Sequence, residues 1–107
     1  MVLREPTFLI LTSLAGGSRH GYGIIQDIAE LSGGRVRLRA GTLYGSLDRL
    51  VDEGLVVPDR EDVENGRLRR YYRITGEGHS VLAAEADRMI ANARAATARL
   101  KMTGGMV

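Results

Sequence analysis

The sequence has no cysteine and no tryptophan, and it has one phenylalanine and one lysine among its 107 residues. Without cysteine, the chain has no disulfide framework, no thiolate metal site and no thiol nucleophile. No apolar run approaches the roughly 18 residues that a membrane-spanning helix needs. No repeat with a period of roughly 20–50 residues is visible either. A single globular domain is the class that remains to be considered.

The motifs of common enzymes are also missing. The sequence "GYG" and the paired glycines lack the spacing of a GxxxxGK[ST] phosphate-binding loop. His20 and His79 stand apart from any cluster of metal ligands, and His20 is expected to make local hydrogen bonds at a helix start. No nucleophile is paired with a base. We therefore expect no catalytic residue, no metal site and no cofactor.

The basic residues are almost all arginine. The net charge is only +2, yet fourteen of the fifteen basic residues are arginines. Arginine forms bidentate pairs with phosphate and with guanine, which suits nucleic-acid contact. The alternative is a genomic base composition that also enriches alanine and glycine. Because Glu5-Pro6 interrupts the order of a signal peptide, we expect a cytoplasmic protein.

Apolar spacing predicts four helices and a β-hairpin. The helices are expected within residues 5–15, before Gly33-Gly34, from residue 40 to a stop at Gly54, and from a cap at Thr75 to about Leu100. Asn-Gly between two strand-like runs is a strong hairpin signal, and Pro58 predicts an edge strand or a bulge. Residues 35–39 alternate arginine with apolar residues and predict a very short strand.

The predicted third helix has a small, uncharged outward face. Leu43, Leu47 and Leu50 lie on one side, and Thr42, Gly45 and Arg49 lie on the other. A glycine in a helix interior costs about 1 kcal/mol relative to alanine. Such a face would allow close approach to bases in a major groove. An ordinary amphipathic surface helix remains the alternative.

Arginines cluster on and after the Asn-Gly turn. Alternation places Arg67, Arg69, Tyr71 and Arg73 on one side of the hairpin. Arg67 and Arg69 are favoured for DNA contact, whereas some of these arginines could instead neutralise the acidic strand before them. Arg35, Arg37 and Arg39 lead into the third helix, where contact with phosphates and simple surface charge are both open.

The last helix carries a heptad seam. Its members are spaced 4, 3, 4, 3 and 4 residues apart, and Ile90 and Thr97 widen the seam. They are Leu82, Ala86, Met89, Ala93, Ala96 and Leu100. With the apolar first helix, this seam predicts a dimer. The expected dimerisation residues are Phe8, Leu11, Leu82, Ala86, Met89, Ile90, Ala93 and Leu100.

Together these patterns predict a mainly α, α+β fold, a winged helix-turn-helix with a two-stranded β-wing and a long C-terminal dimerisation helix. We expect the DNA-binding domain to span residues 1–75 and the dimerisation helix residues 76–101. A flexible tail is expected over residues 102–107.

Four stretches resemble the PadR-type transcriptional regulators. They are "HGYGI" at 20–24, "GTLYGSLDRLVDEGLV" at 41–56, "NGRLRRYYRIT" at 65–75 and Gly78. The resemblance implies a winged-helix homodimer that acts as a bacterial repressor, often released by a small molecule, and that dimerises through its first and last helices. By position, Thr42, Tyr44 and Gly45 would belong to the DNA-reading helix. Asn65, Gly66 and Arg67 would form the wing tip.

The sequence departs from the family pattern at Gly45, where many relatives have proline. The single C-terminal helix is similar to the short branch of the family. Some short relatives bind flat drugs in an aromatic-lined dimer cavity, but this chain is poor in aromatic residues. Phe8, Met89 and Ala93 are the candidate lining of an effector site at the dimer interface.

We therefore expect a sequence-specific DNA-binding regulator, a homodimeric repressor that binds an inverted-repeat operator in double-stranded DNA and has no membrane association. The alternative is a winged-helix module that binds another protein and no specific DNA. The expected DNA-binding residues are Arg39, Thr42, Tyr44, Gly45, Arg49, Asn65, Gly66, Arg67 and Arg69.

Overall fold

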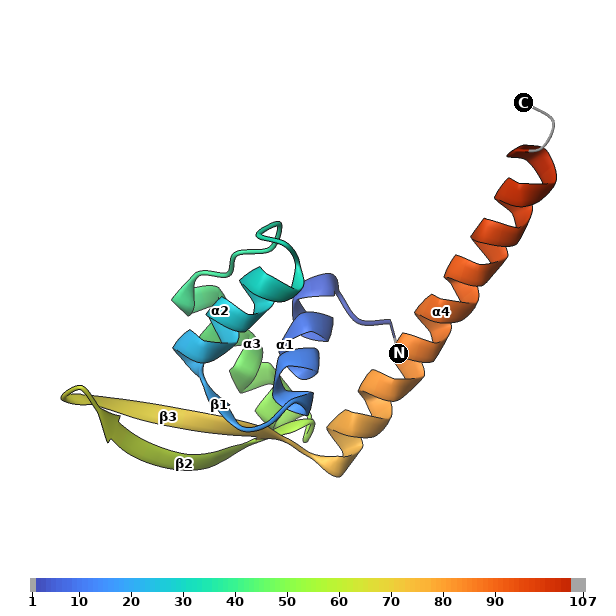
Figure 1. Cartoon of the computed structure of the whole chain (residues 1–107). Coiled ribbons are helices and arrows are strands. Elements are labelled where there is room, and N and C mark those ends of the chain that lie inside the picture. Colours follow the sequence, from blue (N-terminus) through green and yellow to red (C-terminus); the bar gives the residue numbers. More distant parts are fainter. Residues whose placement is uncertain (1, 105–107) are drawn as a thin grey trace.

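The computed structural model describes residues 2–104, which form four helices and a small antiparallel sheet (Figure 1). The three-helix body and the hairpin correspond to the predicted winged helix-turn-helix. The elements in chain order are α1 (Glu5–Ala15), β1 (Arg19–His20), α2 (Gly21–Leu31), α3 (Ala40–Asp52), β2 (Val56–Glu64), β3 (Arg67–Ile74) and α4 (Gly76–Gly104).

One apolar core joins the first three helices to the base of the hairpin. Its side chains are at most 6% exposed, and they come from the apolar faces that helical spacing and strand alternation predict. The core residues are Ile10, Leu11, Leu14, Ile24, Ile28, Leu43, Leu47, Leu50, Leu55, Val56, Tyr72 and Ile74. Burial of these leucines and isoleucines fixes α3 against α2 and the base of β2 and leaves its opposite face exposed.

Side-chain caps fix where two helices begin. The amide of Gly23 donates to Nδ1 of His20 over 3.0 Å, so His20 caps α2. The amide of Gly78 donates to Oγ1 of Thr75 over 3.0 Å at the start of α4. Both bonds satisfy amides that a helix start would otherwise leave unpaired. The predicted local role of His20 and the predicted cap at Thr75 are confirmed.

The hairpin turn is the predicted Asn-Gly turn. Asn65 and Gly66 have φ angles of 51° and 76°, the left-handed values that a tight hairpin turn requires. The register of β2 against β3 shifts between Pro58 and Glu61. The prediction that Pro58 marks a bulge is therefore confirmed. The pairing continues to the tip, where Val63 is opposite Leu68.

The third strand of the sheet is not the predicted one. Residues 35–39 form no strand, so that prediction was wrong. The amide of Val36 donates a hydrogen bond to the hydroxyl of Ser32 over 2.9 Å. Within residues 2–104, no neighbouring strand pairs with residues 35–39. The third strand is β1, whose two residues pair with β3 to give the order β1-β3-β2. Two residues are too few to show any periodicity in sequence.

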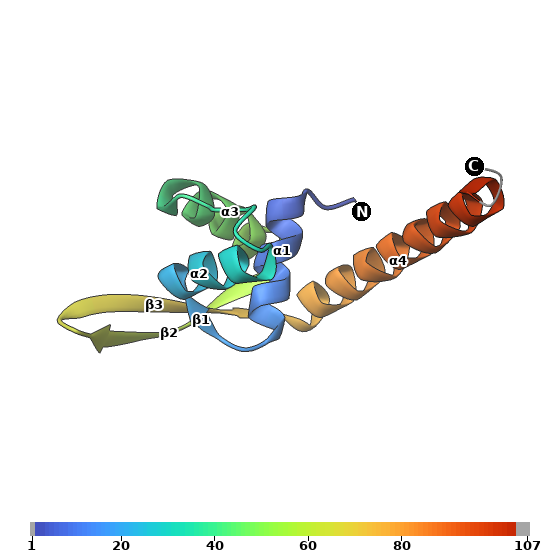
Figure 2. The same cartoon turned by 45° about the horizontal axis from the view of Figure 1, so that its top comes forward.

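Helix α4 leaves the body in the direction opposite to the hairpin (Figures 1 and 2). A Cβ at Gly78 would overlap the Leu55 carbonyl and lie 2.7 Å from Ile74 Cγ1, so the absence of a side chain lets α4 start against the sheet. The helix continues to Gly104, three residues beyond the boundary expected at residue 101. Residues 105–107 lie outside the described part of the chain.

A buried carboxylate joins α4 to the N-terminal segment. Glu85 is 2% exposed and accepts hydrogen bonds from the Leu3 amide, over 2.7 Å, and from Nε of Arg88. The bond from Arg88 and then the one from Leu3 lower the pKa of Glu85 from 4.5 to about 2. Because each oxygen has a donor, the buried charge is compensated. Residue 3 is thereby fixed to the first half of α4.

Candidate nucleic-acid interface

The outward face of α3 is open as the helical spacing predicts. Thr42 and Arg49 are exposed, Gly45 is partly exposed, and nothing lies within 4 Å of a Cβ built on Gly45. Ser46 follows Gly45 in α3, and its side chain is buried. Its hydroxyl accepts a hydrogen bond from Nη2 of Arg49 over 3.2 Å. An approaching surface would therefore meet a glycine backbone between a threonine and an arginine.

Tyr44 connects α3 to the start of α2. Its ring packs on the backbone of Gly21, where a Cβ would lie 2.7 Å from Cζ of the tyrosine. The residue is still 42% exposed. A side chain on the first glycine of "HGYG" would therefore displace this ring. Tyr44 lies beside the open face of α3.

The segment before α3 contains two arginines with different surroundings. Arg35 donates two hydrogen bonds to the carboxylate of Glu5, over 2.9 and 2.6 Å, and this contact raises the pKa of Arg35. The charge of Arg35 is therefore neutralised by Glu5 of the same chain. Arg39 is exposed immediately before the first turn of α3. A basic side chain there lies close to the helix N-terminus, which itself favours anions.

The arginines of the hairpin fall into two groups. Nε of Arg70 lies 3.5 Å from Glu61, and Nε of Arg73 lies 3.8 Å from Asp59, so these two neutralise the acidic strand. Within residues 2–104, neither Arg67 nor Arg69 forms an ion pair. Arg67 is exposed, whereas Arg69 is half-buried with its guanidinium 5.7 Å from the ring centre of Tyr22. Its Nε is buried and has no hydrogen-bond partner within that range.

An aromatic and ionic cluster, made of His20, Tyr71, Glu64 and Arg60, holds the hairpin against the start of α2. The rings of His20 and Tyr71 meet edge to face at 5.2 Å, and the guanidinium of Arg60 lies 3.9 Å from the tyrosine ring centre. The hydroxyl of Tyr71 donates to Glu64, and this bond is the main cause of the raised pKa of Tyr71. The contact between α2 and the hairpin was missed because β1 was not predicted.

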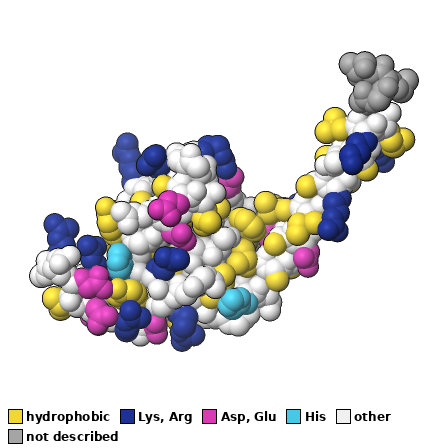
Figure 3. Space-filling model, viewed as in Figure 1, with side chains coloured by type: hydrophobic (Ala, Val, Ile, Leu, Met, Phe, Trp, Pro, Cys, Tyr) yellow, Lys and Arg dark blue, Asp and Glu magenta, His cyan; other side chains and the backbone are white. Residues whose placement is uncertain are grey.

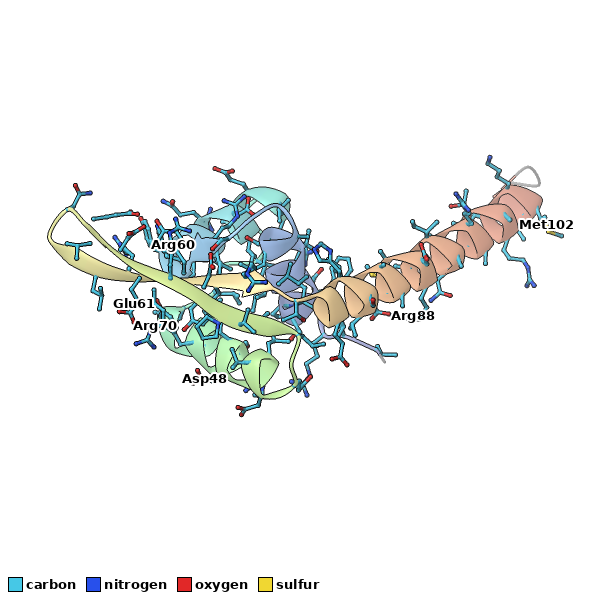
Figure 4. The ribbon with its side chains drawn as sticks, turned by 90° about the horizontal axis from the view of Figure 1, so that it is seen from below. Asp48, Arg60, Glu61, Arg70, Arg88 and Met102 are labelled. Atoms are coloured by element: carbon cyan, nitrogen blue, oxygen red, sulfur yellow. The ribbon has the colours of Figure 1, made fainter. Side chains whose placement is uncertain are left out.

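A groove of about 730 Å³ separates α3 from the hairpin. Asp48 and Asp52 line it from α3, and Glu61 and Arg70 line it from the hairpin; Asp48, Glu61 and Arg70 are marked in Figure 4. Carboxylates on both walls disfavour an incoming phosphate. The surface suited to a polyanion therefore excludes this groove. That surface comprises the first turns of α3 and the arginine-bearing end of the hairpin.

The heptad seam on α4 is exposed over most of its length. Met89, Ile90 and Leu100 are 45%, 48% and 68% exposed, and Figure 3 shows apolar side chains along α4. Leu82 is different, because it packs partly against the core of its own chain.

Two of the residues expected at a dimer interface come from α1. Leu11 was one of them, but it is 0% exposed and lies inside the core, so its side chain cannot reach a partner. Phe8 lines a hollow of about 200 Å³ together with Met89. Ala93 and Ile90 line another hollow, of about 410 Å³, further along α4. The three candidate effector-lining residues are thus divided between two hollows.

Over residues 2–104, no helix is long and apolar enough to cross a membrane. In the same range, His, Asp and Glu side chains nowhere gather in a group of three or more that would suit a metal ion.

Comparison with known proteins gives the same family from sequence and from structure. Residues 10–84 match the model of the family described as "Transcriptional regulator PadR-like family". The transcriptional regulator Rv3488 of Mycobacterium tuberculosis is 40% identical over 76 residues, which are 71% of this chain and 67% of that protein. A transcriptional regulator from Clostridium thermocellum superposes with a TM-score of 0.71 at 25% identity, over 85% of this chain and 88% of that one.

A structure with nucleic acid is also similar. The Bacillus subtilis PadR structure, solved in complex with operator DNA, has a TM-score of 0.66 and 26% identity. The match covers 76% of this chain and 46% of the Bacillus chain.

Proposed function

The chain belongs to the PadR-like family of transcriptional regulators, and we propose that it represses transcription as a cytoplasmic homodimer bound to an inverted-repeat operator. One observation carries the DNA-binding role. The face of α3 around Gly45 is open, and Arg67 beside the hairpin turn is exposed and forms no ion pair within residues 2–104. Helix α3 enters a major groove, and the hairpin holds the adjacent backbone or minor groove. The Bacillus relative, which was solved in complex with operator DNA, supports a DNA-binding role.

The homodimer rests on the exposed seam of α4. Met89 and Leu100 belong to the exposed heptad series and Ile90 widens it, and a second copy of the helix would remove this apolar stripe from water. Ala86 and Ala93 let the two helices approach closely. Two-fold symmetry of the dimer then places two copies of α3 on symmetric half-sites about one helical turn apart.

The effector site is proposed at the hollow between α1 and α4. Phe8 and Met89 supply an apolar wall, and Arg88 and Glu5 supply charged groups at its edge. A volume of about 200 Å³ in one chain is small, and a second copy would extend it. A ligand that binds there changes the angle between α4 and the body, and so the distance between the two DNA-reading helices.

Salt dependence tests the DNA-binding role. We propose measuring the affinity for duplex DNA from upstream of the gene over a range of salt concentrations, by fluorescence anisotropy. In the dimer, Arg67→Ala removes two phosphate contacts and lowers the log–log slope by about 1.8, at roughly 0.9 per contact. Arg70→Ala is the matched control, because its guanidinium is already paired with Glu61 and its slope should change less. A slope that Arg67→Ala does not alter removes the hairpin from the interface.

Sedimentation tests the dimer separately. Ile90→Asp places a carboxylate in the seam and should give a monomer. Ala91→Asp is the matched control, because this exposed position lies on the opposite side of α4. If the Ile90 variant stays a dimer, the seam is not the interface.

A further inference from the structure

His20 lies between the start of α2 and the hairpin and contacts both. On one side, its Nδ1 accepts a hydrogen bond from the amide of Gly23 over 3.0 Å. On the other side, its Nε2 lies 4.0 Å from Oε2 of Glu64 in β2, and its ring meets the ring of Tyr71 in β3 edge to face. The side chain of His20 is 19% exposed. One imidazole therefore connects α2 to both strands of the hairpin.

Only the neutral imidazole can make the contact with α2. A ring nitrogen that accepts a hydrogen bond carries no proton, so the proton of a neutral His20 is on Nε2, the nitrogen nearer to Glu64. Protonation places a second proton on Nδ1, which removes the acceptor for Gly23 and brings a positive charge to the N-terminus of α2, where the helix dipole disfavours it. The same charge attracts the carboxylate of Glu64 more strongly. Proton uptake therefore favours the hairpin contact at the expense of the helix cap.

The surroundings of His20 leave the carboxylate of Glu64 free for this exchange. The titratable and charged groups around His20 are Glu64 and Arg60 from β2, Tyr71 from β3 and Arg19 from β1 itself. Both arginines already form ion pairs with carboxylates other than Glu64. Glu64 accepts a hydrogen bond from the Tyr71 hydroxyl, which is neutral, and so keeps its negative charge. Within residues 2–104, no arginine forms an ion pair with Glu64, so its carboxylate is available to a charged His20.

The two elements that His20 connects both bear on the proposed DNA-binding surface. The ring of Tyr44 from α3 packs on the backbone of Gly21, the first residue of α2. Loss of the cap therefore loosens the support of a ring that lies beside the open face of α3. Glu64 is the cross-strand partner of Arg67, so a shift of Glu64 toward His20 also moves the arginine beside the hairpin turn.

We propose that His20 is a positioning residue for DNA binding, and that its neutral imidazole keeps α3 and the hairpin in the geometry that binds DNA. This inference rests on the proposed DNA-binding function. When His20 takes up a proton, the cap of α2 is lost, Glu64 turns toward the imidazolium, and the affinity for DNA falls. Histidine is the side chain whose charge ordinarily changes between about pH 5 and 8, so mild acidification is enough to drive this exchange.

The test compares the affinity of the full-length protein for duplex DNA from upstream of the gene at about pH 8 and at about pH 5.5, at constant salt, by fluorescence anisotropy. The wild type should bind about fivefold more weakly at the lower pH, the effect of one lost helix cap on an equilibrium constant. Acidification otherwise adds positive charge to the protein and strengthens its attraction to DNA, so a loss of affinity has the opposite sign to the general effect.

His20→Asn separates the cap from the proton. Asparagine is an efficient helix cap that does not titrate, so this variant should lose no affinity at the lower pH. His79→Asn is the matched control, because it removes the other histidine, which is exposed on α4, and it should keep the wild-type loss. Glu64→Gln keeps an acceptor for Tyr71 but removes the charge that attracts the imidazolium, so its loss should be smaller than that of the wild type.

Amide hydrogen exchange, measured by NMR on the protein without DNA, provides the second readout. The protection of the Gly23 amide should fall several-fold at the lower pH in the wild type and stay constant in His20→Asn. A wild type that binds DNA equally well at both pH values, or a His20→Asn protein with the same loss, overturns the inference and leaves DNA binding intact. Constant protection of Gly23 in the wild type overturns it as well. If no duplex binds at either pH, the proposed function fails, and the role of His20 in DNA binding fails with it even where the protection of Gly23 falls.

Discussion

Gly45→Ala should separate the stability of the domain from its function. The structure leaves open space where the new methyl group would go, since nothing lies within 4 Å of it. Gly45 is the sixth residue of α3, in the helix interior, so the difference in helix propensity applies in full. Alanine should therefore raise the free energy of unfolding by about 1 kcal/mol. For a domain of this size, that corresponds to a rise of roughly 4 °C in the melting temperature.

DNA binding should change in the opposite direction. The methyl group projects from the centre of the face that we place in the major groove, between Thr42 and Arg49. It would hold the helix backbone away from the bases and weaken one or more base contacts, each worth about 1–3 kcal/mol. The dissociation constant should rise about tenfold or more. Thermal unfolding and anisotropy on one preparation measure both effects. Gly76→Ala, another site with open space but at the start of α4, should leave binding unchanged.

Two results would refute this reasoning. A destabilised Gly45→Ala protein would mean that α3 does not have the open outward face described here. A stabilised protein with unchanged affinity and specificity would mean that the glycine does not lie against DNA. In the second case, the glycine would be a tolerated local cost, and the DNA-reading surface would have to be placed elsewhere on the helix.

Three further substitutions test the packing. Gly78→Ala should lower the free energy of unfolding by about 1–3 kcal/mol, because its Cβ would overlap the Leu55 carbonyl; an unchanged denaturation midpoint would contradict this close packing. Gly21→Ala should displace the ring of Tyr44 and weaken DNA binding more than it changes the melting temperature; equal affinity would show that the ring position is irrelevant. The pKa of Glu85 is lowered to about 2, so its stabilising contribution is present above pH 4.5 and is lost as the pH falls toward 2. The difference in stability between the wild type and Glu85→Gln should shrink over that range, and a difference independent of pH would exclude this role.

Patterns that repeat within one element predicted this fold well. The leucines of α3 recur at helical spacing, and the Asn65-Gly66 turn needs only its own two residues to adopt left-handed angles. The two errors in strand assignment have one cause. Residues 35–39 alternate like a strand but have no neighbouring edge, whereas β1 is a strand only because β3 lies beside it.

Features that depend on distant partners were not predictable. Glu85 is buried because it meets Leu3, which lies 82 residues away along the chain. Tyr44 packs on Gly21, and nothing local to either residue indicates the other. The burial of Leu11 shows a further limit. Apolar periodicity identifies a residue that avoids water, but it cannot tell whether the cover comes from the same chain or from a second one.

The contact between Glu85 and Leu3 holds α4 at one point, so a small rotation about that point moves the far end of the helix by a larger distance. From Glu85 to Gly104 the helix runs about 29 Å, at roughly 1.5 Å per residue. A rotation of about 7° about that point therefore moves the far end by about 3.5 Å, close to the rise of one base-pair step. The two hydrogen bonds to the Glu85 carboxylate resist rotation of α4 at this point. In the proposed dimer, the stiffness of this one contact would decide whether operators that differ by a single base pair in half-site separation can be bound equally well.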